Sequence, residues 1–153
     1  MTKRIRRVGL TGGIAAGKSA VAERLAELGA VVVDHDLLAR AVLEVGSSGA
    51  RAVRQTFGDD VMIEDDTVDR AALADVVFAD DEALAALEQI IHPIVRSEAQ
   101  KAEANARSHG DVIVVHDIPL LVETGQEDSF DLVVVVAAPE DVRLDRLVNR
   151  GLD

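Results

Sequence analysis

Four short runs read as strands along the chain, at residues 6–11, 31–33, 111–116 and 131–137. Most of these runs are apolar throughout instead of alternating, which is typical of strands buried on both faces of a sheet. Apolar positions at helical spacing follow at 18–28, at 37–43 and from 139 onward, and Gly29 is placed to end the first of these helices. Strands separated by helices predict an α/β fold in three layers, with a parallel sheet covered by helices on both faces.

The stretch from about residue 49 to 107 has a helical pattern, so we expect a helical insertion on one side of the sheet. Asp69 is placed to cap one of its helices, and "VMIEDDTV" interrupts the region as a small hairpin or turn. Residues 80–107 read as one longer helix that Pro93 should bend or divide. The apolar face expected for this helix consists of Leu84, Leu87, Ile91 and Ile94.

Composition narrows the class of protein. A chain of 153 residues suits one domain, and 28 acidic against 16 basic residues give a formal charge of −12. Such an acidic surface repels polyanions, so we expect no binding to nucleic acid or to an anionic membrane. The sequence has no cysteine and shows neither a secretory signal nor an apolar run of roughly 20 residues, so a cytoplasmic protein is expected.

Residues 12–19, "GGIAAGKS", match the spacing G-x-x-x-x-G-K-[ST] between an expected strand and an expected helix. Glycines there let backbone N–H groups curl around a phosphate, and the following helix adds its positive N-terminus. Lys18 supplies charge for the β- and γ-phosphates, and the hydroxyl of Ser19 can ligate Mg²⁺. This predicts a nucleotide-phosphate site of the P-loop NTPase type. The residues expected to form it are Gly12, Gly13, Ile14, Ala15, Ala16, Gly17, Lys18, Ser19 and Ala20.

Acidic residues follow two of the expected strands, at the edge where ligands of parallel sheets lie. If the second strand stays extended, Asp34 and Asp36 share one side and His35 points to the other. One carboxylate can then orient an acceptor hydroxyl and take its proton while another helps to hold Mg²⁺; alternatively, either Asp caps the following helix. Asp117 ends the third strand like a Walker-B carboxylate that reaches the Mg²⁺ shell through water, unless it is a loop carboxylate without a role.

Histidines give weaker signals. His92 lies on a helical face, where a single histidine is more often structural than catalytic, and His109 and His116 carry still less weight. No pair of histidines has the spacing of zinc ligands.

Three arginines of the last expected helix, Arg143, Arg146 and Arg150, fall on one face. Their guanidinium groups can neutralise ATP phosphates or the charge that develops during transfer, or they can form a solvated charged face. We favour a functional role for Arg146.

Taken together, these segments resemble the bacterial dephospho-CoA kinase family over essentially the whole chain. The segments with the order and spacing of that family are "GLTGGIAAGKS", "VVVDHDLLAR", "FGDDV", "DRAALADVVF", "IIHPIVR", "DIPLLVETG" and "VVVVAAPEDVRLDRLVNRG". The most specific are "DHD", "HP" and "PLLVE", since the P-loop occurs in many other small kinases.

The resemblance implies an enzyme that transfers the γ-phosphate of Mg²⁺-bound ATP to the ribose 3′-hydroxyl of dephospho-CoA. It implies Asp36 as the general base, Lys18 on the transferring phosphate, Arg146 as a phosphate-stabilising arginine, and Ser19 and Asp117 on the Mg²⁺ side. The helical insertion would border the acceptor. The residues implied at the acceptor site are Asp34, Asp36, His92, Leu120 and Glu123.

Two departures from the family pattern matter. Position 20 is Ala where such loops often carry a second hydroxyl, and we expect little effect because Ser19 is the metal ligand. The sequence stops at "NRGLD" where the family continues with a lid and a further strand, so we expect slow transfer, ATP hydrolysis and an apolar edge at residues 131–137 that favours self-association. The alternatives are another P-loop kinase of the nucleoside or shikimate type, and a nucleotide-binding module without transfer activity.

Overall fold

The computed structural model describes residues 5–13, 15–64, 66–110 and 113–149. The chain divides into two compact units: residues 1–36 together with 102–153, here called the sheet unit, and residues 37–101, here called the helical unit. Helix α5 (Asp81–Ser108) begins in the helical unit, and its last turns belong to the sheet unit.

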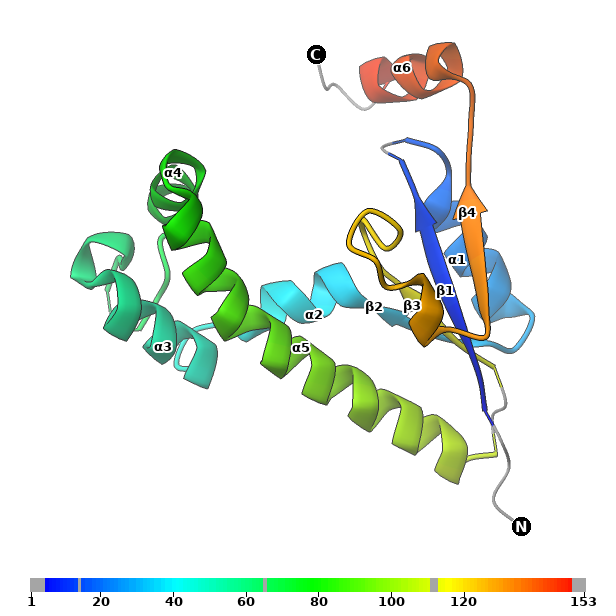
Figure 1. Cartoon of the computed structure of the whole chain (residues 1–153), viewed down its shortest axis with the longest axis horizontal. Coiled ribbons are helices and arrows are strands. Elements are labelled where there is room, and N and C mark those ends of the chain that lie inside the picture. Colours follow the sequence, from blue (N-terminus) through cyan, green and yellow to red (C-terminus); the bar gives the residue numbers. More distant parts are fainter. Residues whose placement is uncertain (1–4, 14, 65, 111–112, 150–153) are drawn as a thin grey trace. The chain divides into compact units, whose positions relative to one another are not determined.

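The sheet unit is built on four parallel strands, as the apolar runs predict (Figure 1). Their order in the sheet is β2-β3-β1-β4. After β2 the chain crosses over, so that β3 lies between β2 and β1 in the sheet. The carboxyl ends of β1, β2 and β3 therefore lie side by side. The strands are β1 (Arg6–Gly12), β2 (Val31–Asp34), β3 (Ile113–Asp117) and β4 (Leu132–Val136); residues 111 and 112 of the expected third strand lie outside the described residues.

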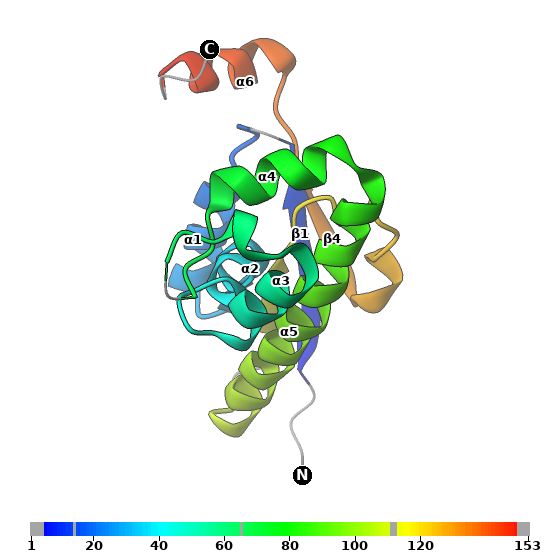
Figure 2. The same ribbon diagram turned by 90° about the vertical axis from the view of Figure 1, so that its left-hand side faces the viewer.

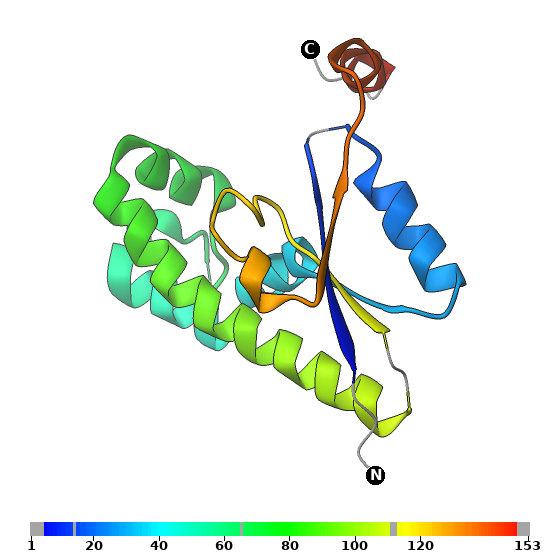
Figure 3. The same cartoon turned by 45° about the vertical axis from the view of Figure 1, so that its right-hand side comes forward.

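Both faces of this sheet are covered, which confirms the three-layer arrangement. Helix α1 (Lys18–Glu27) packs against β1 and β2 on one face (Figure 3). It ends as expected at Gly29, whose φ of 103° suits glycine. A Cβ at Gly9, on the other face, would lie 2.6 Å from the side chain of Leu121 and 2.9 Å from that of Phe130, so this face is closely packed too.

Strand β4 forms one edge of the described sheet. Leu132 and Val135 are 58% and 60% exposed there, although both are apolar. The chain continues into helix α6 (Glu140–Asn149), whose first turn holds Glu140 and Asp141 as expected. Self-association through this edge stays a prediction.

The helical unit has its own core. It contains α3 (Ser48–Phe57), the 3₁₀ turn η1 (Asp59–Val61), α4 (Arg70–Ala79) and most of α5 (Figure 2). Asp69 caps α4 by accepting a 3.1 Å hydrogen bond from the N–H of Ala72, and an antiparallel bridge between Met62 and Val68 makes the expected small hairpin. The buried core cluster consists of Ala50, Val53, Val61, Val68, Leu73 and Val77.

Helix α5 differs in part from what the sequence predicts. The helix runs undivided through Pro93, because the only backbone bond that proline removes is the one to the carbonyl of Gln89, which lies on the exposed side and can be hydrated. Of the predicted apolar face, Leu87 packs against the core cluster as expected, whereas Leu84 is 37% exposed and Ala83 and Ile90 pack against the cluster in its place. Among the described helices, none combines the length and apolarity that a membrane span requires.

Candidate active site

The glycine-rich loop lies where β1 ends and α1 begins. Ala15 and Gly17 have φ angles of 59° and 107°, and the N–H of Ala16 donates a 3.1 Å hydrogen bond to the carbonyl of Gly13. Backbone that alternates into the left-handed region turns successive N–H groups toward one point, which is the geometry that holds a phosphate. Ile14, part of the predicted loop, lies outside the described residues.

Two glycines of this loop have close neighbours in β4 and α6. A Cβ at Gly12 would lie 2.7 Å from the carbonyl oxygen of Val136 in β4, and one at Gly13 would lie 2.9 Å from Nη1 of Arg143 in α6. Both distances are shorter than real Cβ contacts. At Gly12 the neighbour is backbone, so a side chain would displace the loop or β4, whereas at Gly13 the neighbour is the end of a flexible arginine side chain that can move aside. Strand β4 and helix α6 thus close around the phosphate-binding loop.

The N-terminus of α1 completes an anion site. Gly17 is the N-cap, no side chain caps the helix within the described residues, and the first turn holds no acidic residue. The first N–H groups of a helix have no partner inside it, and the helix dipole makes them a binding site for anions. The donors that a nucleotide phosphate needs are therefore available.

Lys18 and Asp117 form an ion pair at the base of the loop. Lys18 Nζ lies 2.8 Å from Asp117 Oδ1, and the two side chains are only 18% and 10% exposed. The pair is an ionic contact outside hydrogen-bond geometry, and the buried Oδ1 has no hydrogen-bond donor among the described residues. This oxygen can therefore accept a hydrogen bond from a water of a bound cation. Ser19, expected to ligate that cation, is the next residue after Lys18 and is exposed.

Few acidic side chains of the described residues are placed to bind a metal ion at this site. Asp34 and Asp117 are in register on adjacent strands, which places both on the face of the sheet that α1 covers. Within the described parts of the chain, no group of three or more His, Cys, Asp or Glu side chains is arranged to hold a metal. A hard cation such as Mg²⁺ fits this donor set only if most of its ligands are water and phosphate oxygens, as is usual for Mg²⁺.

Two of the three predicted arginines reach the loop. Arg146 Nη1 donates a 2.8 Å hydrogen bond to the carbonyl of Ala15, and Arg143 Nη1 approaches Gly13. The Nε of Arg143 is buried without a hydrogen-bond partner among the described residues, so this side chain keeps donor capacity. Arg150, the third, lies outside the described residues.

The "DHD" segment differs from the extended form considered in the sequence. Strand β2 ends at Asp34 and helix α2 (His35–Val42) begins at the next residue, so Asp34 and Asp36 do not lie on one face of a strand. Asp36 is instead the acidic residue of the first turn of α2, where the helix dipole favours a negative charge. Both aspartates are exposed, and Asp36 stands next to the carboxyl end of the sheet.

A buried polar chain behind "DHD" was missed from the sequence, where His116 carried little weight. His35 Nε2 lies 2.9 Å from His116 Nδ1, and His116 Nε2 lies 2.6 Å from Glu103 Oε1. Arg7 Nε donates to the same carboxylate at 2.6 Å. The only sequence signal was a histidine ending an apolar strand, because Glu103 comes from a helix whose register the pattern leaves open.

Burial sets the protonation of this chain. Burial lowers the pKa of His35 to about 4, and the adjacent His116 contributes to that shift. Burial also lowers the pKa of His116, against the opposing effect of Glu103. Although burial acts to raise it, hydrogen bonds from Arg7 and His116 lower the pKa of Glu103. Near neutral pH both imidazoles are therefore neutral, and they link the ion pair of Arg7 and Glu103 to the start of α2.

The remaining predicted acceptor residues are not brought together by a contact in the described structure. Leu120 is 60% exposed with a φ of 56°, and Glu123 is exposed in the following turn of the sheet unit. His92 is exposed on α5 within the helical unit. Their part in acceptor binding stays a prediction.

A model of the dephospho-CoA kinase family matches residues 6–152. The chain is 49% identical to a dephospho-CoA kinase of Cutibacterium acnes over 145 residues and 48% identical to one of Streptomyces avermitilis over 147 residues. These alignments cover 94% and 95% of this chain, which spans 63% and 71% of the lengths of the two relatives.

Solved structures agree with these sequence matches. A crystal structure of a Thermus thermophilus protein superposes with a TM-score of 0.87 at 36% identity, covering 99% of this chain and 75% of the other. A dephospho-CoA kinase from Campylobacter jejuni gives a TM-score of 0.70 at 25% identity, covering 95% of this chain and 72% of the other.

Proposed function

Because this chain belongs to the dephospho-CoA kinase family, we propose that it transfers the γ-phosphate of ATP to the ribose 3′-hydroxyl of dephospho-CoA. In this reaction a bond forms between the hydroxyl oxygen and the γ-phosphorus, the bond to the β–γ bridging oxygen breaks, and ADP leaves. The observation that carries the proposal is the loop of β1 and α1 with its ion pair and two arginines, beside acids at the end of β2.

The loop residues supply the nucleotide site. The free N–H groups at the start of α1 and the backbone of residues 12–17 hold the phosphates, and Lys18 moves its charge from Asp117 to the transferring group. Arg146 and Arg143, already at the loop, neutralise charge on the equatorial oxygens during transfer. Mg²⁺, when bound, would neutralise phosphate charge, and Ser19 and Asp117 are the residues that would hold it.

Asp36 supplies the general base. Its carboxylate is exposed at the first turn of α2 and can orient the 3′-hydroxyl and accept its proton as the new bond forms. Asp34, in register with Asp117, supports the side of the site where the cation lies. His92, Leu120 and Glu123 contribute to binding of dephospho-CoA.

The test is direct. The chain is supplied with Mg²⁺, ATP and dephospho-CoA, and CoA and ADP are measured by mass spectrometry. Lys18→Ala should abolish both ATP binding and CoA formation, whereas Asp36→Asn should keep ATP binding and lose CoA formation. Lys101→Ala and Asp128→Asn, at exposed positions, serve as matched controls.

The outcomes separate the alternatives. CoA formation that neither Lys18→Ala nor Asp36→Asn reduces would remove the roles given to these residues. Binding of ATP without any CoA would favour a nucleotide-binding module without transfer activity. Phosphorylation of a nucleoside in place of dephospho-CoA would assign the chain to a different kinase activity.

A further inference from the structure

Three side chains from separate elements form a continuous hydrogen-bonded chain inside the sheet unit. Glu103 of α5, His116 of β3 and His35 of α2 follow one another at 2.6 Å and 2.9 Å. His116 is only 2% exposed and the side chain of Glu103 14%. Such a buried polar chain is costly unless each member is satisfied, so its geometry is tightly defined.

The order of donors and acceptors in this chain is fixed by chemistry. The carboxylate of Glu103 has no proton to give, so Nε2–H of His116 must donate to it. The Nδ1 of neutral His116 is then an acceptor, and Nε2–H of His35 donates to it. The lowered pKa values of both histidines agree with this neutral pair.

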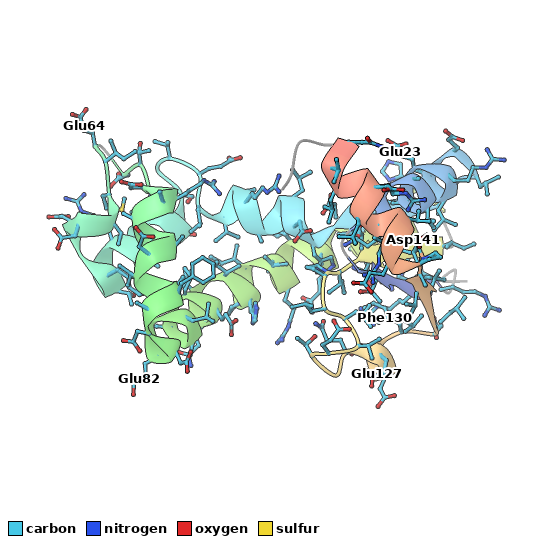
Figure 4. All side chains as sticks on the ribbon, turned by 90° about the horizontal axis from the view of Figure 1, so that it is seen from above. Glu23, Glu64, Glu82, Glu127, Phe130 and Asp141 are labelled. Carbon is cyan, nitrogen blue, oxygen red and sulfur yellow. The ribbon has the colours of Figure 1, made fainter. Side chains whose placement is uncertain are left out.

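The surroundings lock the chain in one arrangement. Arg7 Nε donates to Glu103 at 2.6 Å and balances its charge, while the guanidinium of Arg7 also lies 5.0 Å from the centroid of the Phe130 ring. The ring of Phe130, labelled in Figure 4, is 5.6 Å from that of His116. A neutralised, packed network holds its outermost member, His35, with little freedom.

His35 is also the junction between the two aspartates. It is the first residue of α2, directly before Asp36 and directly after the last residue of β2. A ring tied to the central strand β3 therefore fixes the backbone from which Asp36 projects. Misplacement of a reacting group by about 1 Å can cost on the order of 100-fold in rate, so this anchoring has catalytic consequences.

We propose that Glu103 and His116 are positioning residues that hold His35, and through it the carboxylate of Asp36, in the orientation needed to accept the acceptor hydroxyl proton. This inference rests on the proposed function for the role of Asp36. None of the three side chains needs to touch substrate.

His35→Leu and His35→Gln form a matched pair for the test. Leucine keeps the volume and removes the donor, whereas the amide of glutamine can donate from nearly the same place as Nε2 of histidine. We expect kcat to fall about 10–100-fold in His35→Leu, with KM for ATP unchanged, and to recover to within about threefold of the wild type in His35→Gln. Equal kcat in the wild type and His35→Leu, or equal losses in both variants, would overturn the proposal.

Amide hydrogen exchange at Ala39, whose N–H pairs with the carbonyl of His35 in the first turn of α2, tests the anchoring without using activity. In His35→Leu the exchange should become about tenfold faster than in the wild type, and in His35→Gln it should stay close to the wild type. Unchanged exchange in His35→Leu would overturn the proposal. If the wild-type protein makes no CoA, the proposed function fails. The exchange measurement alone then decides whether the hydrogen bonds of Glu103, His116 and His35 hold the start of α2.

Glu103→Gln tests the inner end if His35→Leu does not fold. Proton NMR of the wild type should show a downfield Nε2–H signal from His116, because a charged acceptor makes a strong hydrogen bond. The signal should move upfield in Glu103→Gln, together with a lower kcat and an unchanged KM for ATP. A proton on Nδ1 of His116 in the wild type would contradict the proposed order of donors and acceptors.

Discussion

Replacing Asp117 with Asn separates the two tasks assigned to this carboxylate, which are to pair with Lys18 and to serve the Mg²⁺ side of the site. At 2.8 Å and an effective dielectric constant of about 20, the attraction between the two unit charges is about 6 kcal/mol. Desolvation of two side chains that are 18% and 10% exposed offsets most of this attraction. Asparagine removes the attraction but leaves Lys18 largely buried and charged.

The expected loss for Asp117→Asn is therefore about 2 kcal/mol in the free energy of unfolding, somewhat less than for a fully buried pair. For a chain of this size that corresponds to a decrease of about 4–8 °C in Tm, measured by circular dichroism without nucleotide. Asp59→Asn is the control, because Asp59 lies 2.7 Å from Arg54 Nε but the side chains are 78% and 50% exposed. The control should keep the Tm of the wild type within the error of the measurement.

Nucleotide binding should respond differently from stability. Without Mg²⁺, Asp117→Asn should bind ATP at least as tightly as the wild type, because Lys18 no longer has to leave a carboxylate to reach the phosphates. With Mg²⁺, turnover should fall about tenfold or more and need more Mg²⁺ for half its maximum, since an amide is a poorer acceptor for metal-bound water. A variant as stable as the wild type, or one that loses ATP binding in EDTA, would refute this account of the pair.

Three further outcomes follow from packing and charge. Gly12→Ala should lower the free energy of unfolding by about 1–3 kcal/mol, measured by urea denaturation, because its Cβ would lie 2.7 Å from the backbone oxygen of Val136. Val53→Ala, at a fully buried position of the helical unit, should cost about 2 kcal/mol in the same assay, whereas Val45→Ala, 66% exposed, should change it by less than about 0.5 kcal/mol. Since the folded pKa of His35 is about 4 and its ordinary value 6.5, the unfolded chain binds the proton first; this contribution to stability is present above pH 6.5 and is lost as the pH falls toward 4. In His35→Gln the decline between these pH values should be shallower.

Local chemistry made much of the sheet unit predictable. The apolar runs specified parallel strands, Gly29 ended α1, and the motif spacing placed the loop between β1 and α1. The same local signals located the Asp69 cap in the helical unit. Each of these features depends on residues a few positions apart, so the pattern of the chain contains the necessary information.

The predictions that differ from the structure concern features that are set by packing between residues far apart in the sequence. Leu84 and Ala83 are adjacent on α5, and helical spacing alone does not tell which of them turns toward the core cluster. At "DHD" the sequence is compatible with an extended strand, but an acid at the start of α2 favours a helix there, and a hydrogen bond from His35 to His116 of β3 holds it in place.

Sheet topology predicts the positions of Asp34 and Asp117 but not the position of Glu103. Once β2 and β3 are taken as adjacent parallel strands, acids that follow both must meet at one edge, and the register of Asp34 with Asp117 is a consequence of that. The same register brings His35 near His116, because Val33 pairs with His116 and His35 comes two residues later. Glu103 obeys no such rule, since it reaches the sheet from a helix of 28 residues whose rotation about its axis is set by contacts of both units. A sequence that lost Glu103 would thus keep every motif of the family and still leave the histidine pair without its acceptor.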